Sequence, residues 1–192
     1  MRYEIVIDAG ETPNKCTIAP LASRADFKLI RVRGAVGLLG PFEVPYLLHP
    51  DGTCLTELVK NEAHLPSGIA AIDCVWNRLD YLISKVAAPL PRLASLPKGF
   101  VTAYPRKSAQ NTDPEQGLAT IEAIFIGAAL MGNWDPSLFS QYYFGLKFLE
   151  LNQKLFLELG VKQAAELSAF PAMPPKNRNS AQRRRDRGRF RS

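Results

Sequence analysis

The sequence predicts an α/β protein built around a parallel sheet. The run Ile-Ala-Ala-Ile at 69–72 contains no polar residue before Asp73, which is typical of a central parallel strand covered on both faces. Residues 75–86 follow with apolar side chains at helical spacing, and a further apolar run predicts a short buried strand at 100–105. Strands and helices that alternate in this way indicate an α/β fold.

Residues 1–52 are predicted to form a small β-rich unit. The segments 2–10 and 27–34 alternate apolar and polar residues with period two, which is the pattern of half-buried strands. A third strand is predicted within 41–55, where it runs into a Pro-Asp-Gly turn. We therefore expect a strand-rich unit ahead of the helical part of the chain.

Residues 53–170 are predicted to form a second unit. A helix is expected over the first part of this unit, ending at His64 before a Leu-Pro-Ser-Gly stop. The run 89–99 is rich in proline and predicts a loop, and the polar run 106–117 predicts another.

Two long helices are expected towards the end of the second unit. Residues 118–132 are strongly apolar and include small side chains, which allow close packing. Residues 135–160 predict one long helix or a broken pair, capped at Asp135 or Ser137 and stopped at Gly160.

The positive charge of the chain is concentrated at its carboxyl end. The formal net charge is +6, and residues 176–192 hold eight of the 24 Lys and Arg and one of the 18 Asp and Glu. That segment carries +7 and the rest of the chain −1. Residues 171–192 are therefore predicted to be a disordered, Arg-rich tail. Such tails attract the phosphate backbone of RNA, although a tail that only improves solubility has the same composition.

Several classes of site are excluded by missing motifs. The sequence has no apolar run of about 18 residues and no signal-peptide segment, so we expect a cytoplasmic protein without membrane contact. Its three cysteines and two histidines lack the spacing of zinc ligands, so no metal site is expected. It has neither Gly-x-Gly-x-x-Gly after a strand nor a Walker lysine motif, so nucleotide phosphates have no evident cradle.

Asp73 is the leading candidate for a functional side chain. Ligands of open α/β sheets lie beyond the carboxyl ends of the strands, and Asp73 stands at such an end. Small or apolar residues surround it in the sequence, and Trp76 follows three positions later. A pocket of this composition suits an adenosyl cofactor better than ATP.

Four segments carry motifs that occur together in one known family. Residues 72–80 read IDCVWNRLD, residues 11–22 read ETPNKCTIAPLA, residues 96–132 join LPKGFVTAYP to an apolar helix, and residues 144–159 read FGLKFLELNQKLFLEL. In this order they resemble the Asp/Glu-Cys-Ser-Trp, Asp-Pro-Lys-Lys-Cys-Thr-Gly, Leu-Pro and closing-helix segments of the small-subunit rRNA aminocarboxypropyltransferases. The resemblance covers about residues 3–160.

The resemblance implies a fold and a reaction. The family is related to the SPOUT methyltransferases. The resemblance therefore implies a SPOUT-like parallel-sheet domain with a C-terminal trefoil knot at 53–170, which follows an RLI-like amino-terminal region. These enzymes bind S-adenosylmethionine and transfer its 3-amino-3-carboxypropyl group to a modified uridine or pseudouridine of small-subunit rRNA during ribosome biogenesis. The implied partner is this rRNA or a pre-ribosomal particle. We expect a monomer.

Asp73 and Trp76 match the catalytic positions of the family. Asp73 corresponds to the acid near the reacting arm, where it would hold the amino group or accept the ring proton. Trp76 corresponds to the aromatic residue placed against the sulfonium methyl. Its position on an apolar stripe also fits an ordinary core residue.

Six further residues match cofactor-binding positions of the family. Thr17 corresponds to the residue that holds the carboxylate of the aminocarboxypropyl arm, although a turn residue fits equally well. Ile72 corresponds to a position that lines the cofactor. The residues expected around the adenine, or in the loop that closes over it, are Leu96, Phe100, Gln116 and Thr120.

Departures from the family pattern leave other functions open. Val75 stands where the family has serine, and residues 104–109 lack its Asn-Tyr-Gly. A non-catalytic RNA-binding or ribosome-assembly protein on the same fold is one alternative, and an RNA methyltransferase is another. Glu122 lies inside an apolar helix and is predicted to bond the backbone of a loop.

Overall fold

The computed structural model describes residues 1–8, 16–105 and 117–167 of the 192-residue chain. Within them, five strands form one sheet in the order β2-β1-β4-β3-β5, and every neighbouring pair is parallel. The strands are β1 (Arg2–Asp8), β2 (Phe27–Val32), β3 (Tyr46–Cys54), β4 (Gly68–Asp73) and β5 (Arg92–Ser95). The predicted α/β class with a parallel sheet is confirmed.

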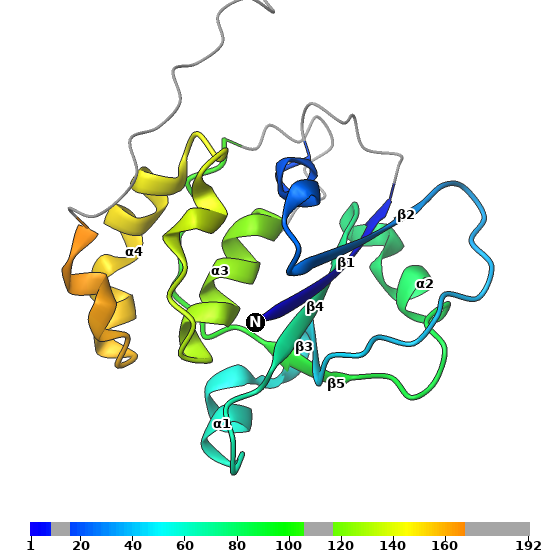
Figure 1. Ribbon diagram of the computed structural model, residues 1–192, viewed down its shortest axis with the longest axis horizontal. Helices are drawn as coiled ribbons and strands as arrows, with labels where there is room; N and C mark the ends of the chain where they lie inside the picture. Colours follow the sequence, from blue (N-terminus) through cyan, green and yellow to red (C-terminus); the bar gives the residue numbers. More distant parts are fainter. Residues whose placement is uncertain (9–15, 106–116, 168–192) are drawn as a thin grey trace, which may run out of the picture.

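Helices cover both faces of the sheet (Figure 1): α3 and α4 lie on one face, and α2 lies on the other. The helices and shorter helical turns are η1 (Ala19–Ser23), α1 (Leu55–Lys60), η2 (Trp76–Arg78), α2 (Leu79–Ile83), α3 (Thr120–Leu130), η3 (Pro136–Phe139), α4 (Gly145–Glu158) and η4 (Lys162–Ala165). No helix in the described ranges is both long and apolar enough to cross a membrane.

β4 is the centre of the fold, and all six of its residues are buried. Ile69 and Ala71 pack in the hydrophobic cluster with α3 and α4, whereas Ala70 and Ile72 pack in the cluster with α2. Both faces of the strand are therefore covered, which explains why it holds no polar residue before its last position. Gly127 of α3 allows the close approach, because a Cβ there would lie 2.6 Å from Ile69 Cδ1.

β3 contains an irregularity where the sequence predicts a turn. Leu48 and Thr53 both pair with Ala94 of β5, so the residues between them bulge out of the ladder. A Cβ on Gly52 would lie 2.5 Å from the Ala94 nitrogen, so only glycine allows the backbones to approach this closely. The predicted Pro-Asp-Gly turn is thus a bulge, and the strand continues to Cys54.

The predicted boundary at residue 52 lies inside β3. Strands from both predicted units share the sheet, since β1 pairs with β2 on one side and with β4 on the other. The division into 1–52 and 53–170 stays a prediction, as does the trefoil knot. The predicted tail at 171–192 lies outside the described residues.

Three local predictions are wrong. α1 ends at Lys60 and does not reach His64. The Pro-rich run 89–99 contains β5, whose Ala94 is fully buried, because prolines on both sides of a four-residue strand conceal it in the sequence. Residues 100–105, in contrast, form no strand.

Asn152 of α4 explains why residues 100–105 need no strand partner. Its Oδ1 accepts a hydrogen bond from the Val101 nitrogen at 2.7 Å, and its Nδ2 donates to the Val101 oxygen at 2.8 Å. These are the two bonds that a neighbouring strand would otherwise make. Nδ2 also donates to the Phe148 oxygen at 2.8 Å, and the residue is 1% exposed.

Replacing Asn152 with leucine should lower the free energy of unfolding by about 1–3 kcal/mol, because both backbone groups of Val101 lose their partner. Gln153→Leu is the control, since that amide makes one bond, to the Ala164 oxygen at 2.9 Å. Urea denaturation of both variants measures the difference. Equal losses of stability would contradict this account.

Candidate functional site

Asp73 ends β4 at the carboxyl edge of the sheet and is 7% exposed. Its two carboxylate oxygens accept hydrogen bonds from segments far away in the sequence. Thr120 Oγ1 donates to Oδ1 at 2.6 Å, and Cys16 Sγ donates to Oδ2 at 3.1 Å. The carboxylate therefore joins the start of α3 to the segment that precedes η1.

The position of Asp73 in β4 and the position of Thr120 in α3 explain why these two side chains meet. Ile69, Ala71 and Asp73 are alternate residues of β4, so they project from the face that α3 covers. Thr120 is the first residue of α3. The amino end of a helix carries partial positive charge, which stabilises a carboxylate at this place.

Thr17 lies beside this group. Its hydroxyl oxygen accepts a hydrogen bond from the Ile121 nitrogen at 3.4 Å, so the residue after Cys16 also contacts the first turn of α3. The structure thus brings three of the predicted site residues together, namely Thr17, Asp73 and Thr120.

The thiol of Cys16 is a hydrogen-bond donor in this arrangement. Its burial and the neighbouring Asp73 carboxylate raise the pKa of Cys16 to about 11. The thiol therefore stays protonated near neutral pH and can donate to Asp73. Cys16 is not among the site residues predicted from the sequence, although its position directly before Thr17 in the motif is an available signal.

Ile72 and Trp76 lie with the α2 cluster. Ile72 is 9% exposed, and the half-buried Trp76 packs against the same hydrophobic residues. Asp73 projects from the other face of β4, so packing alone does not bring Trp76 together with the carboxylate. The roles of Ile72 and Trp76 stay predictions.

The predicted adenine-lining residues belong to the cluster with α3 and α4. Phe100 is 4% exposed, and its ring centroid lies 5.0 Å from that of Phe156. Leu96 is partly buried against the same cluster. Gln116 lies outside the described residues.

Glu122 bonds loop backbone, as predicted. It is fully buried, and its carboxylate accepts from the Ala103 and Ala119 nitrogens, each at 2.9 Å. Thr102 Oγ1 donates to it at 2.6 Å and Tyr142 OH at 2.9 Å. One carboxylate therefore holds both Ala119, next to Thr120, and Ala103, next to Tyr104.

A second acidic residue ends the neighbouring strand. Asp8 closes β1 and is 5% exposed, and its Oδ2 lies 2.6 Å from Arg78 Nε. Arg78 also donates to the Gly34 oxygen at 3.0 Å, and its guanidinium lies over the Tyr81 ring at 5.3 Å. This pair is not among the residues predicted from the sequence, although Asp8 ends a largely apolar strand as Asp73 does.

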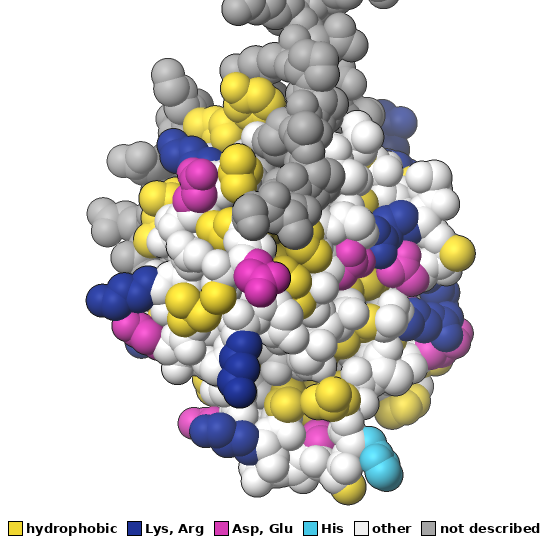
Figure 2. Space-filling model, turned by 60° about the vertical axis from the view of Figure 1, so that its left-hand side comes forward, with side chains coloured by type: hydrophobic (Ala, Val, Ile, Leu, Met, Phe, Trp, Pro, Cys, Tyr) yellow, Lys and Arg dark blue, Asp and Glu magenta, His cyan; other side chains and the backbone are white. Residues whose placement is uncertain are grey.

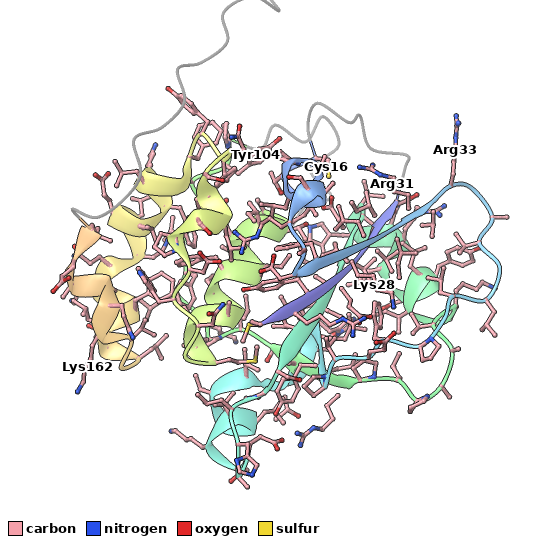
Figure 3. All side chains as sticks on the ribbon, in the orientation of Figure 1. Cys16, Lys28, Arg31, Arg33, Tyr104 and Lys162 are labelled. Carbon is pink, nitrogen blue, oxygen red and sulfur yellow. The ribbon has the colours of Figure 1, made fainter. Side chains whose placement is uncertain are left out.

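Cations without an acidic partner lie near the carboxyl end of β2. Arg31 and Arg33 are exposed, and within the described ranges neither forms an ion pair. Arg2, Lys28 and Arg92, in contrast, are paired with carboxylates. Figure 3 shows Cys16, Arg31 and Arg33 along one margin of the molecule.

Two cavities lie away from Asp73. One of about 420 Å³ is lined by Val44 and Tyr46 at the amino end of β3, and one of about 460 Å³ is lined by Trp134 and Lys162. None of the predicted site residues within the described ranges lines either cavity. We place the candidate site at Asp73, because hydrogen-bonding side chains from three segments converge there.

The fold matches a solved structure, the SAM-dependent rRNA:acp-transferase Tsr3 from Vulcanisaeta distributa. The two share 20% sequence identity and a TM-score of 0.55, over 88% of this chain and 86% of that chain. This chain has the fold of that transferase. The resemblance inferred from the sequence is therefore confirmed for the fold. No family model and no curated protein matches the sequence.

The Cys16 thiol should resist alkylation at about pH 8, where ordinary thiols begin to ionise. Asp73→Asn removes the carboxylate that helps to raise the pKa of Cys16, so alkylation of Cys16 should become faster. Peptide mass spectrometry follows the modification, with the half-buried Cys54 as an internal control. An unchanged rate of alkylation would contradict the conclusion that the Asp73 carboxylate raises the pKa of Cys16.

The raised pKa of Cys16 also fixes the sign of a pH effect. The unfolded thiol ionises at lower pH than the folded one, so this thiol's contribution to stability is complete below the ordinary thiol pKa. It should be lost as the pH rises through about 11. Cys16→Ser should flatten this part of the curve of unfolding free energy against pH.

Proposed function

We propose that this chain is a transferase that uses S-adenosylmethionine to add a 3-amino-3-carboxypropyl group to a modified uridine or pseudouridine of small-subunit rRNA. The observation that carries the proposal is the convergence of Thr17, Asp73 and Thr120 at the carboxyl edge of the sheet. The shared fold with an rRNA:acp-transferase supports it. We place this activity in ribosome biogenesis in the cytoplasm and assign it to a monomer.

The residues at this edge fit the charges of the cofactor. The arm to be transferred carries an ammonium group and a carboxylate. Asp73 would hold the ammonium group, whereas the hydroxyl of Thr17, beside the amino end of α3, suits the carboxylate. Thr120 would hold the Asp73 carboxylate in place, because its hydroxyl hydrogen is already donated to Oδ1. Leu96 and Phe100 supply apolar surface for the adenine.

When bound, S-adenosylmethionine supplies a sulfonium leaving group, so that the arm is transferred and methylthioadenosine departs. The chain's task is then mainly to orient the reacting carbon. Each oxygen of Asp73 has two lone pairs and already accepts one hydrogen bond, from Thr120 or from Cys16. One lone pair on each oxygen remains for the amino group, so we assign Asp73 to holding the arm.

Small-subunit rRNA is the proposed partner because exposed positive charge lies near this edge and the sequence holds further positive charge at its carboxyl end. Arg31 and Arg33 are exposed near the end of β2, and residues 176–192 carry +7. Phosphate contacts of this kind position RNA without reading its sequence. The target base would therefore be selected near Asp73.

A non-catalytic RNA-binding protein on the same fold is the second candidate. The packing of Ile72 and Trp76 with the α2 cluster favours it, because the family's reaction needs an aromatic residue near the sulfonium. Such a protein would bind rRNA through the same basic edge. It would release no methylthioadenosine.

Asp73→Asn should weaken S-adenosylmethionine binding by about 10- to 100-fold, the equivalent of one charge-assisted hydrogen bond of about 1.5–3 kcal/mol. Asp80→Asn, on an exposed acid of α2, should change nothing. Calorimetry measures binding, and mass spectrometry of rRNA nucleosides distinguishes the aminocarboxypropyl group from a methyl group. Wild-type protein that binds no cofactor and yields no methylthioadenosine with rRNA would refute the transferase.

Replacing Arg31 and Arg33 together with alanine should weaken rRNA binding and reduce the slope of log K against log salt by about two. Lys162→Ala is a matched control, since Lys162 is also exposed and lies away from that margin (Figure 3). Fluorescence anisotropy at several salt concentrations measures both quantities. If Lys162→Ala had an equal effect, the proposal that rRNA binds at Arg31 and Arg33 would be wrong.

A further inference from the structure

Three aromatic side chains form a ledge close to the candidate site. This aromatic ledge consists of Tyr104, Tyr143 and Phe144. The Phe144 ring meets Tyr143 edge-on at 5.0 Å and Tyr104 edge-on at 6.0 Å, measured between ring centroids. Tyr143 is 46% exposed, and the other two are half-buried. Aromatic surface therefore reaches solvent here on a group of rings that pack against one another.

The aromatic ledge is supported from below by buried contacts. Tyr142 is 6% exposed, and its hydroxyl donates to Glu122 Oε1 at 2.9 Å. Gly145 lets the start of α4 close onto Phe139, because a Cβ there would lie 2.6 Å from Phe139 Cβ. The Tyr142 ring in turn lies 5.9 Å from that of Phe144 and 6.5 Å from that of Tyr104, measured between centroids. Rings held by buried neighbours lose little conformational freedom when they bind a partner.

Hydrogen bonds connect the aromatic ledge to the Asp73 site. Glu122 bonds the nitrogen of Ala103, next to Tyr104, and the nitrogen of Ala119, next to Thr120. Thr120 in turn donates to Asp73. Figure 3 shows Tyr104 along the same margin as Cys16 and Arg31, with Cys16 between them.

Positive charge flanks the aromatic ledge. Lys147 is exposed in the first turn of α4, three positions after Phe144, and forms no ion pair with any described residue. Arg31 and Arg33 lie on the far side of Cys16 in Figure 3. In Figure 2, which turns the α4 side forward, hydrophobic side chains gather at the upper end of this face. Exposed aromatic rings together with cations are the usual composition of a surface that binds single-stranded RNA.

We propose that the aromatic ledge stacks a nucleobase of single-stranded RNA, adjacent to the nucleotide that reaches Asp73. This inference rests on the proposed function and names the contact that would hold the neighbouring base. Stacking accepts any base, because every base has a π-face. The aromatic ledge would therefore hold the strand in place while Asp73 and its neighbours act on one position.

The test compares Tyr143→Leu with Tyr143→Phe in the full chain. Leucine keeps apolar volume and removes the ring, whereas phenylalanine keeps the ring and removes only the hydroxyl. The probe is a fluorescein-labelled oligoadenylate of about ten nucleotides, within the site sizes known for single strands. A second probe has abasic positions in place of its central bases.

We expect Tyr143→Leu to weaken binding of the intact oligoadenylate by roughly 5- to 100-fold, as stacking of one base predicts. The salt slope should stay unchanged, because no phosphate contact is lost. Tyr143→Phe should bind like the wild type, and the abasic probe should bind all three proteins equally. Leu157→Ala, on a side chain that is 43% exposed at the other end of α4, controls for loss of exposed apolar surface.

Failure of the aromatic ledge can be distinguished from failure of the proposed function. If the wild-type chain binds small-subunit rRNA and Tyr143→Leu binds the oligoadenylate equally well, the aromatic ledge is refuted and the proposed function stands. If Tyr143→Leu also lowers the salt slope, its effect is electrostatic and the stacking role is refuted. A wild-type chain that fails to bind small-subunit rRNA refutes the proposed function itself.

Discussion

The Glu122 carboxylate is fully buried, and it accepts four hydrogen bonds from three segments of the chain. Removing a carboxylate from water costs several kcal/mol unless its oxygens find donors. Here both oxygens are fully used, by two backbone N–H groups and two hydroxyls. The arrangement at the carboxyl edge follows from this one group, because the donors come from residues on each side of 106–116 and from Tyr142. Thr120 and the aromatic ledge are thus positioned by the same anchor.

A similar use of side chains in place of regular secondary structure recurs at Asn152. Residues 100–105 leave the sheet, and their backbone is bonded by Asn152 of α4 and Glu122 of α3. Strand pairing would have fixed this segment beside β5. Side-chain bonding lets it cross from β5 to the start of α3, where Thr120 meets Asp73. The site therefore depends on two buried polar residues, Asn152 and Glu122, whose hydrogen bonds fix the segment that leads to it.

The pattern of apolar residues predicted those strands and helices that bury a whole face, or all of their surface, in the hydrophobic core. β1 and β2 were predicted from alternating apolar and polar residues, and β4 and α3 from strongly apolar runs. β5 was missed because it is four residues long and lies among prolines. The apolar run 100–105 predicts a strand, whereas the side chain that bonds its backbone comes from about fifty residues later, which no local pattern reveals.

The candidate site shows the same limit. Asp73 was predictable from its place at a strand end, and the resemblance added Thr17 and Thr120. Their convergence is a property of the fold, since the hydrogen bonds span 47 and 104 residues. The Asp8–Arg78 pair was missed because only the sheet order places the ends of β1 and β4 beside each other.

The position of Trp76 follows from how a strand ends. Neighbouring residues of β4 project to opposite faces, so Ile72 packs with α2 while Asp73 projects towards α3. This separation holds only along the strand. β4 ends at Asp73 and η2 begins at Trp76, so beyond Asp73 no strand divides the two faces. A ligand that lies across this edge would reach the Asp73 carboxylate from one face and the indole from the other. The proposed transferase therefore requires a cofactor that crosses this edge, whereas a non-catalytic RNA-binding protein does not. The half-buried state of the indole leaves part of its surface for such a contact.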